Sequence, residues 1–120
     1  MLRGIRGATT VTNNSIEEIK TATIEMLNEI LTQNSVNIED IACANFTMTK
    51  DLNCVYPAKY AREIQGFENV PLMCYQELEI ENSLEKCIRV LFLVNTDKPQ
   101  TEIKHIYLNE AKKLRPDLLK

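Results

Sequence analysis

Apolar side chains recur at the spacing of an α-helix in the first third of the chain. Between positions 16 and 30, isoleucine and methionine residues fall on one side of a helix. Ser15 and Glu18 have the spacing of a capping box, in which the two side chains bind free backbone N–H groups at a helix start. The pattern predicts a helix that begins at Ser15 and ends between residues 33 and 36.

Five other segments favour β-strands, because branched and apolar side chains alternate or run together in each of them. They comprise residues 2–8, 41–49, 70–78, 87–95 and 103–108. Pro71 has no N–H to donate, so it restricts the third segment to a sheet edge or to a strand that starts there. Pro57 suits the first turn of a short helix that ends at Gly66. A last helical pattern, in residues 110–118, is stopped by Pro116.

The order of these elements predicts an α+β fold, with a mixed five-stranded sheet and helices on one face. No linker or internal repeat divides the sequence, so we expect one domain across residues 1–120. Residues 87–94 are apolar on both strand alternations, apart from Arg89. The second sheet face therefore also needs a cover, and a symmetric homo-oligomer is the simplest source of one.

Composition narrows the possible functions. Apolar residues make up 44% and charged residues 26% of the chain, as in folded globular proteins. A net charge of −3 and a pI near 5.2 disfavour nucleic-acid binding, which needs a basic surface. The sequence shows no signal peptide, and no apolar run approaches the roughly 20 residues of a membrane span. We expect a cytoplasmic protein with no nucleic-acid or membrane partner.

The supply of cysteine and histidine limits the chemistry further. The four cysteines match no paired zinc-ligand spacing, and we expect buried free thiols at Cys43, Cys54, Cys74 and Cys87. His105 is the single histidine, so the parts for a Cys/His nucleophile pair or a multi-histidine metal site are missing. We expect an exposed His105 without a catalytic role, no metal and no cofactor.

Arg89 is the most informative residue, because it places a permanent charge in the middle of an apolar strand. A buried guanidinium needs an anion, which either the protein or a ligand supplies. Glu77 is the protein candidate, and the pair would then merely fix the strand register. Arg6, which stands between Gly4 and Gly7, favours an anionic ligand instead, because two arginines meet one glutamate and the glycines leave room beside the backbone.

Four further residues allow a functional and an ordinary interpretation. Lys59 and Arg62 lie one helical turn apart, either on one pocket rim or as solvated surface charges. Tyr107 either donates its phenol to a carboxylate or is a half-buried sheet tyrosine. Arg115 is equally ambiguous.

Several longer segments are recognisable together. They are RGIRGATT at 3–10, VYPAKYAREIQGF at 55–67, CYQE at 74–77, KCIRV at 86–90, HIYL at 105–108 and LRPDL at 114–118. In order and spacing, across nearly the whole chain, they resemble the AroH-type chorismate mutases. The sequence departs from that pattern at Tyr56, where phenylalanine is expected, and at Leu72 and Met73, where smaller or more polar residues are frequent.

The resemblance implies a homotrimer of Bacillus chorismate mutase-like fold, a pseudo-α/β barrel with active sites in clefts between subunits. It also implies a set of substrate-binding residues: Arg6, Tyr56, Ala58, Lys59, Arg62, Met73, Cys74, Tyr75, Gln76, Glu77, Arg89, Tyr107, Leu114 and Arg115. Among them, Arg89, Glu77 and Arg6 are the implied catalytic residues.

By the same resemblance, Arg6 and Tyr107 hold a substrate carboxylate, while Glu77 and the Cys74 main chain hold the ring hydroxyl. The implied reaction is the Claisen rearrangement of chorismate to prephenate in phenylalanine and tyrosine biosynthesis. Its transition state gathers negative charge on the ether oxygen, so a fixed cation at Arg89 binds it better than the substrate.

Two alternatives remain open. The first is a non-catalytic trimeric module that binds a small dicarboxylate. The second is an imine or enamine hydrolase on a related architecture, which needs a water-activating group that the sequence does not reveal.

Overall fold

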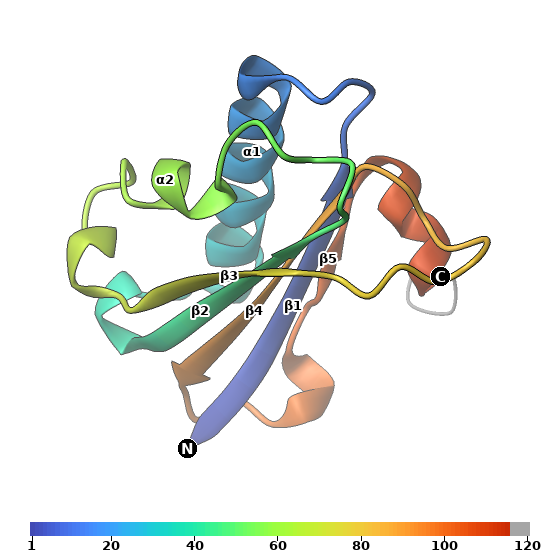
Figure 1. The fold of residues 1–120 in the computed structure, drawn as a ribbon. Helices are drawn as coiled ribbons and strands as arrows, with labels where there is room; N and C mark the ends of the chain where they lie inside the picture. The colour runs from blue at the N-terminus through green and yellow to red at the C-terminus, as the bar shows by residue number, and fades with distance from the viewer. Residues whose placement is uncertain (116–120) are drawn as a thin grey trace.

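Five strands and two α-helices dominate the computed structural model, which describes residues 1–115 (Figure 1). The strands are β1 (Leu2–Thr10), β2 (Ile41–Met48), β3 (Leu72–Gln76), β4 (Cys87–Asn95) and β5 (Ile106–Tyr107). The α-helices are α1 (Ile16–Asn34) and α2 (Pro57–Ala61). Short 3-10 helices are η1 (Ile38–Asp40), η2 (Phe67–Asn69), η3 (Gln100–Glu102) and η4 (Asn109–Leu114).

The strands form one mixed sheet in the order β3-β2-β4-β1-β5. The central strand β4 is antiparallel to β1 and β2, whereas the edge strands β3 and β5 are parallel to their neighbours. The β1/β4 ladder places Ala8 opposite Arg89, and the β2/β4 ladder places Thr47 opposite Arg89. These registers confirm the predicted mixed sheet and decide which side chains share a face.

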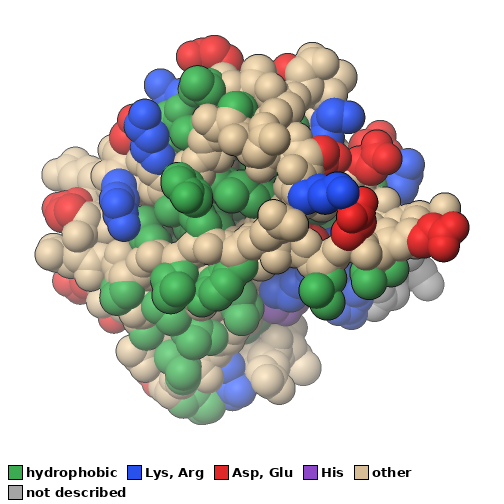
Figure 2. Space-filling model, in the orientation of Figure 1, with side chains coloured by type: hydrophobic (Ala, Val, Ile, Leu, Met, Phe, Trp, Pro, Cys, Tyr) green, Lys and Arg blue, Asp and Glu red, His purple; other side chains and the backbone are tan. Residues whose placement is uncertain are grey.

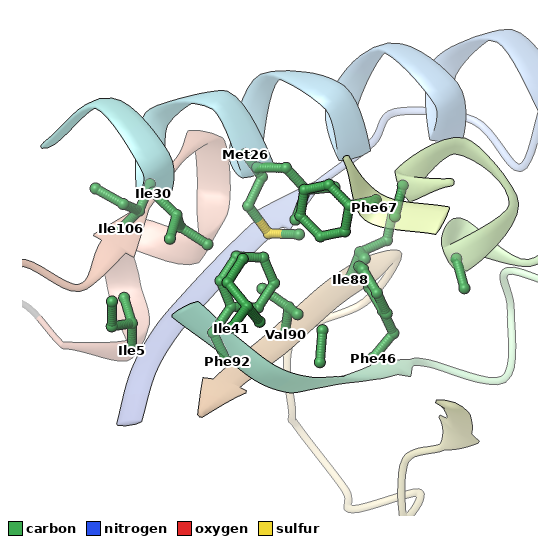
Figure 3. Close-up of a cluster of buried hydrophobic side chains, with 14 of the residues drawn as sticks. Ile5, Met26, Ile30, Ile41, Phe46, Phe67, Ile88, Val90, Phe92 and Ile106 are labelled. Atoms are coloured by element: carbon green, nitrogen blue, oxygen red, sulfur yellow. The ribbon is translucent and has the colours of Figure 1, made fainter. Parts of the chain in front are cut away.

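Helix α1 covers one face of the sheet, and the core lies between them (Figure 3). Met26 and Ile30 of α1 pack above Ile5 and Phe92, which are fully buried. Phe67 closes the end of this layer, with its ring centroid 6.0 Å from that of Phe92. Each such side chain contributes roughly 1.5–3 kcal/mol on burial.

The predicted start of α1 is confirmed, with one difference in its capping. Ser15 Oγ accepts the backbone N–H of Glu18 at 3.2 Å. The Glu18 carboxylate reaches back to the N–H groups of Thr12 and Asn13, and the Asn13 contacts lower the pKa of Glu18. The helix ends at Asn34, as predicted, and is capped by Ser35, whose φ of 50° is left-handed.

Gly7 faces α1 rather than a ligand. A Cβ atom at this position would lie 2.6 Å from Ile30 Cδ1 and 3.1 Å from Met26 Cγ. The missing side chain therefore allows α1 to approach β1 closely. The expectation that both glycines beside Arg6 leave room for a ligand is wrong for Gly7.

The face opposite α1 is called here the open face. Tyr107 and Ala8 are covered at one edge by Ala111 of η4, together with Leu84 and Leu114. Elsewhere on this face, apolar side chains of β1, β3 and β4 remain exposed: Leu2, Met73, Tyr75 and Leu91. Figure 2 shows hydrophobic side chains gathered over the lower half of this view of the molecule. A single chain therefore leaves part of the open face apolar and exposed, on the side of the sheet that was predicted to need a cover.

Two elements are shorter than predicted. The strand expected over residues 70–78 is confined to β3, which begins directly after Pro71 and forms a sheet edge, as Pro71 indicated. The helix expected to reach Gly66 ends at Ala61 as α2. Gly66 instead adopts a φ of 102° and starts the turn into η2.

The last elements also differ from prediction. The strand expected over residues 103–108 is reduced to β5, because the ring of His105 rather than its backbone engages β1. The helical pattern of residues 110–118 is realised as the 3-10 helix η4. The predicted stop at Pro116 lies outside the described residues.

All four cysteines are free thiols, as expected, but only Cys87 is buried. Cys43 and Cys74 are half-buried, and Cys54 is exposed in the loop before α2. The prediction of four buried thiols is therefore wrong for three of them. Within residues 1–115, no helix is both long and apolar enough to cross a membrane.

Candidate active site

Arg89 and Glu77 form an ion pair on the open face. Arg89 Nε lies 3.1 Å from Glu77 Oε2, and the two side chains keep only 27% and 15% of their exposure. Thr47 Oγ1 donates a hydrogen bond to the same Glu77 oxygen at 2.6 Å. Glu77 follows β3 and is anchored by its backbone N–H, which donates to the Met48 carbonyl at 2.9 Å. The anion that Arg89 was expected to need thus comes in part from the protein.

Arg6 reaches the same face from β1. Its guanidinium carbon lies 5.8 Å from the ring centroid of Tyr107, a distance at which a cation and an aromatic face attract. Side chains alternate along β1, so Arg6 and Ala8 share a face, and Ala8 pairs with both Arg89 and Tyr107. Arg6, Glu77, Arg89 and Tyr107 form what is called below the open-face group.

His105 forms a hydrogen bond to the backbone of Arg6, a member of this group. The backbone N–H of Arg6 donates to His105 Nδ1 at 3.0 Å, which requires an unprotonated Nδ1. Burial, followed by the charges of Arg6 and Arg115, lowers the pKa of His105 and favours its neutral form. The expectation of an exposed His105 is wrong, since the residue is half-buried.

Two buried polar atoms of the open-face group lack a hydrogen-bond partner within residues 1–115. They are Tyr107 Oη and Arg89 Nε, whose N–H is not aligned on Glu77 despite the short distance. An unpartnered buried donor costs about 1–3 kcal/mol, so most such groups in folded proteins are paired. Arg89 Nε keeps its ion pair with Glu77, so the Tyr107 hydroxyl is the atom of the two that a ligand oxygen would pair.

Cys87 lies two residues before Arg89 on the same face of β4 and is fully buried. Burial raises the pKa of its thiol to about 11, although the charge of Arg89 opposes the shift. The thiol is therefore protonated near neutral pH and is a poor nucleophile. Its place in the site is that of a packing residue.

Two pockets border the open-face group. One, of about 650 Å³, is lined by Arg89, Leu114 and part of the loop formed by residues 77–86. The other, of about 430 Å³, is lined by Glu77, by the same loop as far as Glu85 and by residues 49–51. Leu114 thus lines the same pocket as Arg89, whereas Arg115 is exposed at the end of the described chain.

A second set of predicted residues gathers around α2, on the α1 side of the sheet (Figure 1). Cys74 pairs with Phe46 of the core, so its side chain points away from the open face. Burial raises the pKa of the Cys74 thiol, while a hydrogen bond from the Ala58 backbone and the charge of Arg62 oppose the shift.

Three more predicted residues line a pocket of about 460 Å³ near α2: Tyr56, Lys59 and Gln76. Tyr56, Ala58, Lys59 and Arg62 are called below the α2 group. The structure therefore separates the predicted residues into two groups on opposite sides of one sheet.

Met73 and Tyr75 project from β3 on the open face and are both exposed. The Tyr75 hydroxyl donates to Asn45 Oδ1 at 3.2 Å. These two side chains border the open-face group without contacting the arginines in any bond that the structure shows within residues 1–115.

Sequence reasoning missed two residues of the site. Thr47 could have been found from the pairing of its strand with that of Arg89, because the register sets the two opposite each other. His105 stands two residues before Tyr107 and hence on the same side of the chain, but only the β1–β5 geometry reveals its bond to Arg6.

Comparisons with known proteins identify the family to which the chain is related. Residues 2–118 match the family described as chorismate mutase type I. Chorismate mutase AroH of Bacillus subtilis (strain 168) is 46% identical over 118 residues, covering 98% of this chain and 93% of the relative. Chorismate mutase AroH of Thermus thermophilus is 47% identical over 119 residues, covering 98% and 97%.

A solved structure supports the same relationship. Chorismate mutase from Clostridium thermocellum superposes with a TM-score of 0.89 at 47% identity, over 92% of this chain and 98% of that one. The chain therefore belongs to the type I chorismate mutase family, whose members are isomerases.

Proposed function

We propose that this protein rearranges chorismate to prephenate with its own side chains, at sites that neighbouring subunits of a homotrimer complete. The observation that carries the proposal is the open-face group, in which Arg89 pairs with Glu77, Arg6 lies against the ring of Tyr107, and the buried Tyr107 hydroxyl forms no hydrogen bond within residues 1–115. Membership of the family indicates chorismate as the substrate, and the open-face group contains side chains suited to bind it. The reaction belongs to phenylalanine and tyrosine biosynthesis, and we place it in the cytoplasm.

The charges of the group suit a dianion. Arg6 and Arg89 carry two positive charges against the single negative charge of Glu77, which leaves a net attraction for carboxylates. Arg6 and the unpartnered hydroxyl of Tyr107 are neighbours through their cation–π contact. A substrate carboxylate would accept hydrogen bonds from both side chains.

Arg89 would act on the reacting bond. In the rearrangement the ether carbon–oxygen bond breaks while a carbon–carbon bond forms, and the ether oxygen gains negative charge in the transition state. A guanidinium held against Glu77 needs little reorganisation when that charge develops, so it stabilises the transition state more than the substrate. No proton transfer or covalent intermediate is needed.

Glu77 and the main chain of Cys74 would hold the ring hydroxyl. The carbonyl of Pro71 accepts from the N–H of Ala44 in β2, and the N–H of Glu77 donates to the carbonyl of Met48 in the same strand. Because these groups alternate along a strand, the N–H and C=O of Cys74 point instead to the free edge of the sheet. The Glu77 carboxylate can accept a hydrogen bond from the hydroxyl, and the Cys74 backbone lies nearby on the outer edge of β3.

A single chain does not bring the α2 group to the open-face group, because the sheet lies between them. A neighbouring copy that packs on the open face would cover its exposed apolar side chains, such as Leu91 and Met73, and could present its own α2 group. We therefore propose that Arg6, Glu77, Arg89 and Tyr107 come from one subunit. Tyr56, Ala58, Lys59 and Arg62 then come from the next.

The proposal is tested by following the loss of chorismate diene absorbance with purified protein and identifying the product by NMR. Sedimentation measures the particle mass in the same buffer. We expect prephenate as the product and a mass three times the 13.8 kDa of the chain. A folded oligomer that binds chorismate without converting it would overturn the mutase and favour the dicarboxylate-binding module.

A further inference from the structure

We infer that Thr47 is a positioning residue for this reaction: its hydroxyl fixes the Glu77 carboxylate in the orientation that holds Arg89 and faces the substrate. The inference deepens the proposed function and rests on it. It is drawn from two contacts to one atom, since Glu77 Oε2 accepts from Thr47 Oγ1 at 2.6 Å and lies 3.1 Å from Arg89 Nε.

The two contacts assign different roles to the two oxygens of the Glu77 carboxylate. Both use Oε2, which places the charge of Glu77 against Arg89 and leaves Oε1 as the oxygen that accepts from the ring hydroxyl. An ionised carboxylate accepts at both oxygens, so this division needs no change in its protonation. Partial rotation about the last side-chain bond of Glu77 would turn the carboxylate away from Arg89 and from the ring hydroxyl, and the Thr47 bond opposes that rotation.

The side chain of Thr47 has less conformational freedom than that of Glu77, the residue whose carboxylate it binds. It lies inside β2, paired with Tyr75 of β3 on one side and with Arg89 of β4 on the other. A β-branched side chain in a strand has few accessible rotamers. Glu77, by contrast, lies beyond the end of β3 at the start of the 77–86 loop, and its long side chain has several rotatable bonds.

The effect of this bond should be measurable in turnover. A hydrogen bond to a charged group changes an equilibrium by roughly tenfold to a hundredfold. Without the hydroxyl, Glu77 samples other rotamers, and Arg89 loses its fixed partner. Because Arg89 is proposed to act mainly in the transition state, we expect the loss to fall chiefly on kcat and less on KM.

The experiment compares Thr47→Val, which removes the hydroxyl and keeps the shape, with Thr47→Ser, which keeps the hydroxyl and removes a methyl group. Both changes are repeated in a Glu77→Ala background. Chorismate turnover gives kcat and KM, while circular dichroism and sedimentation check the fold and the assembly. Thr47→Ala provides a second hydroxyl-free variant if valine disturbs the strand.

We expect kcat of Thr47→Val to fall at least tenfold, that of Thr47→Ser to stay within about threefold, and the valine effect to vanish without Glu77. Equal turnover of the valine and wild-type proteins would overturn the inference, and so would a valine effect that persists in Glu77→Ala. Either result leaves the proposed function intact if the wild type converts chorismate. A wild type that leaves chorismate unchanged overturns the proposed function, and the inference with it.

Discussion

The backbone N–H of Arg6 donates a hydrogen bond to Nδ1 of His105 at 3.0 Å. This bond joins the only histidine of the chain to an arginine of the open-face group, and it exists only while Nδ1 is unprotonated. Burial, and after it the charges of Arg6 and Arg115, already lower the pKa of His105, and protonation would add a further positive charge beside these arginines. The stability of the fold should therefore depend on the charge of this ring.

The sign of that dependence follows from the lowered pKa. The unfolded chain binds a proton at an ordinary histidine pKa of about 6.5, before the folded protein does. The stabilisation from neutral His105 is thus complete above that pH and decreases as the pH falls through the window toward the folded pKa. We expect His105→Asn, whose amide oxygen can accept from Arg6, to lose this part of the pH dependence.

Denaturant unfolding of wild type and His105→Asn at equal concentration, from pH 7.5 to pH 5 (about one unit above and 1.5 units below the ordinary pKa), measures the difference. Carboxylates titrate in both proteins and largely cancel in the comparison. If the free energy of unfolding changes with pH in the same way for both proteins, the His105 ring does not contribute to the pH dependence of stability.

Gly7 should be intolerant of a side chain. A Cβ at Gly7 would come within 2.6 Å of Ile30 Cδ1, whereas one at Gly4 would lie 3.3 Å from Leu91 on the open face. We expect Gly7→Ala to reduce the free energy of unfolding by about 1–3 kcal/mol, because the α1 layer must shift. Gly4→Ala is the matched control on the same strand, and chemical denaturation compares the two. Equal stability of both variants would show that α1 adjusts without cost.

The division into an open-face group and an α2 group predicts complementation between subunits. Arg89→Ala and Arg62→Ala should each lose most of their turnover alone. When the two variants are co-expressed in equal amounts, about a quarter of the interface sites should contain both arginines and recover activity. Arg89→Ala with Arg6→Ala is the control, since both residues belong to the same half and no intact site forms. Activity that stays low in the first mixture would place the site within one subunit.

Substrate affinity should depend strongly on salt. The chain carries a net charge of −3, so a dianionic substrate is attracted by the local arginines and not by the protein as a whole. Salt at about 0.1 M reduces the range of such attraction to roughly 10 Å. We expect KM to rise steadily with ionic strength while kcat changes little. A KM that does not change with salt would argue against a basic cleft.

Much of the fold was predictable because strong local patterns agree with it. The Ser15 cap, the apolar period of α1 and the edge position signalled by Pro71 are all present. The Arg89–Glu77 pair was predictable as one of two alternatives, since an arginine inside an apolar strand needs an anion and Glu77 lies on the preceding predicted strand. In each case the physical demand is local in sequence or specific in chemistry.

The features that escaped prediction depend on long-range geometry. The shortness of β5 arises from a side chain that takes the place of a backbone acceptor, at a separation of 99 residues. The role of Gly7 depends on where α1 crosses β1, and that of Thr47 on the β2/β4 register. The separation of Cys74 from the open face follows from strand alternation once the pairing with Phe46 is known.

The central claim is that Arg89 stabilises the transition state, and kcat for chorismate in Arg89→Ala and Arg89→Lys tests it most directly. We expect kcat of Arg89→Ala to fall by about a hundredfold to a thousandfold, as when a transition-state donor is removed from other enzymes. Arg89→Lys should recover part of this loss, because it keeps the positive charge. Circular dichroism and sedimentation must show that both variants keep the fold and assembly of the wild type. A folded Arg89→Ala with kcat within about threefold of wild type would contradict the claim, because that is far below the effect of losing such a donor.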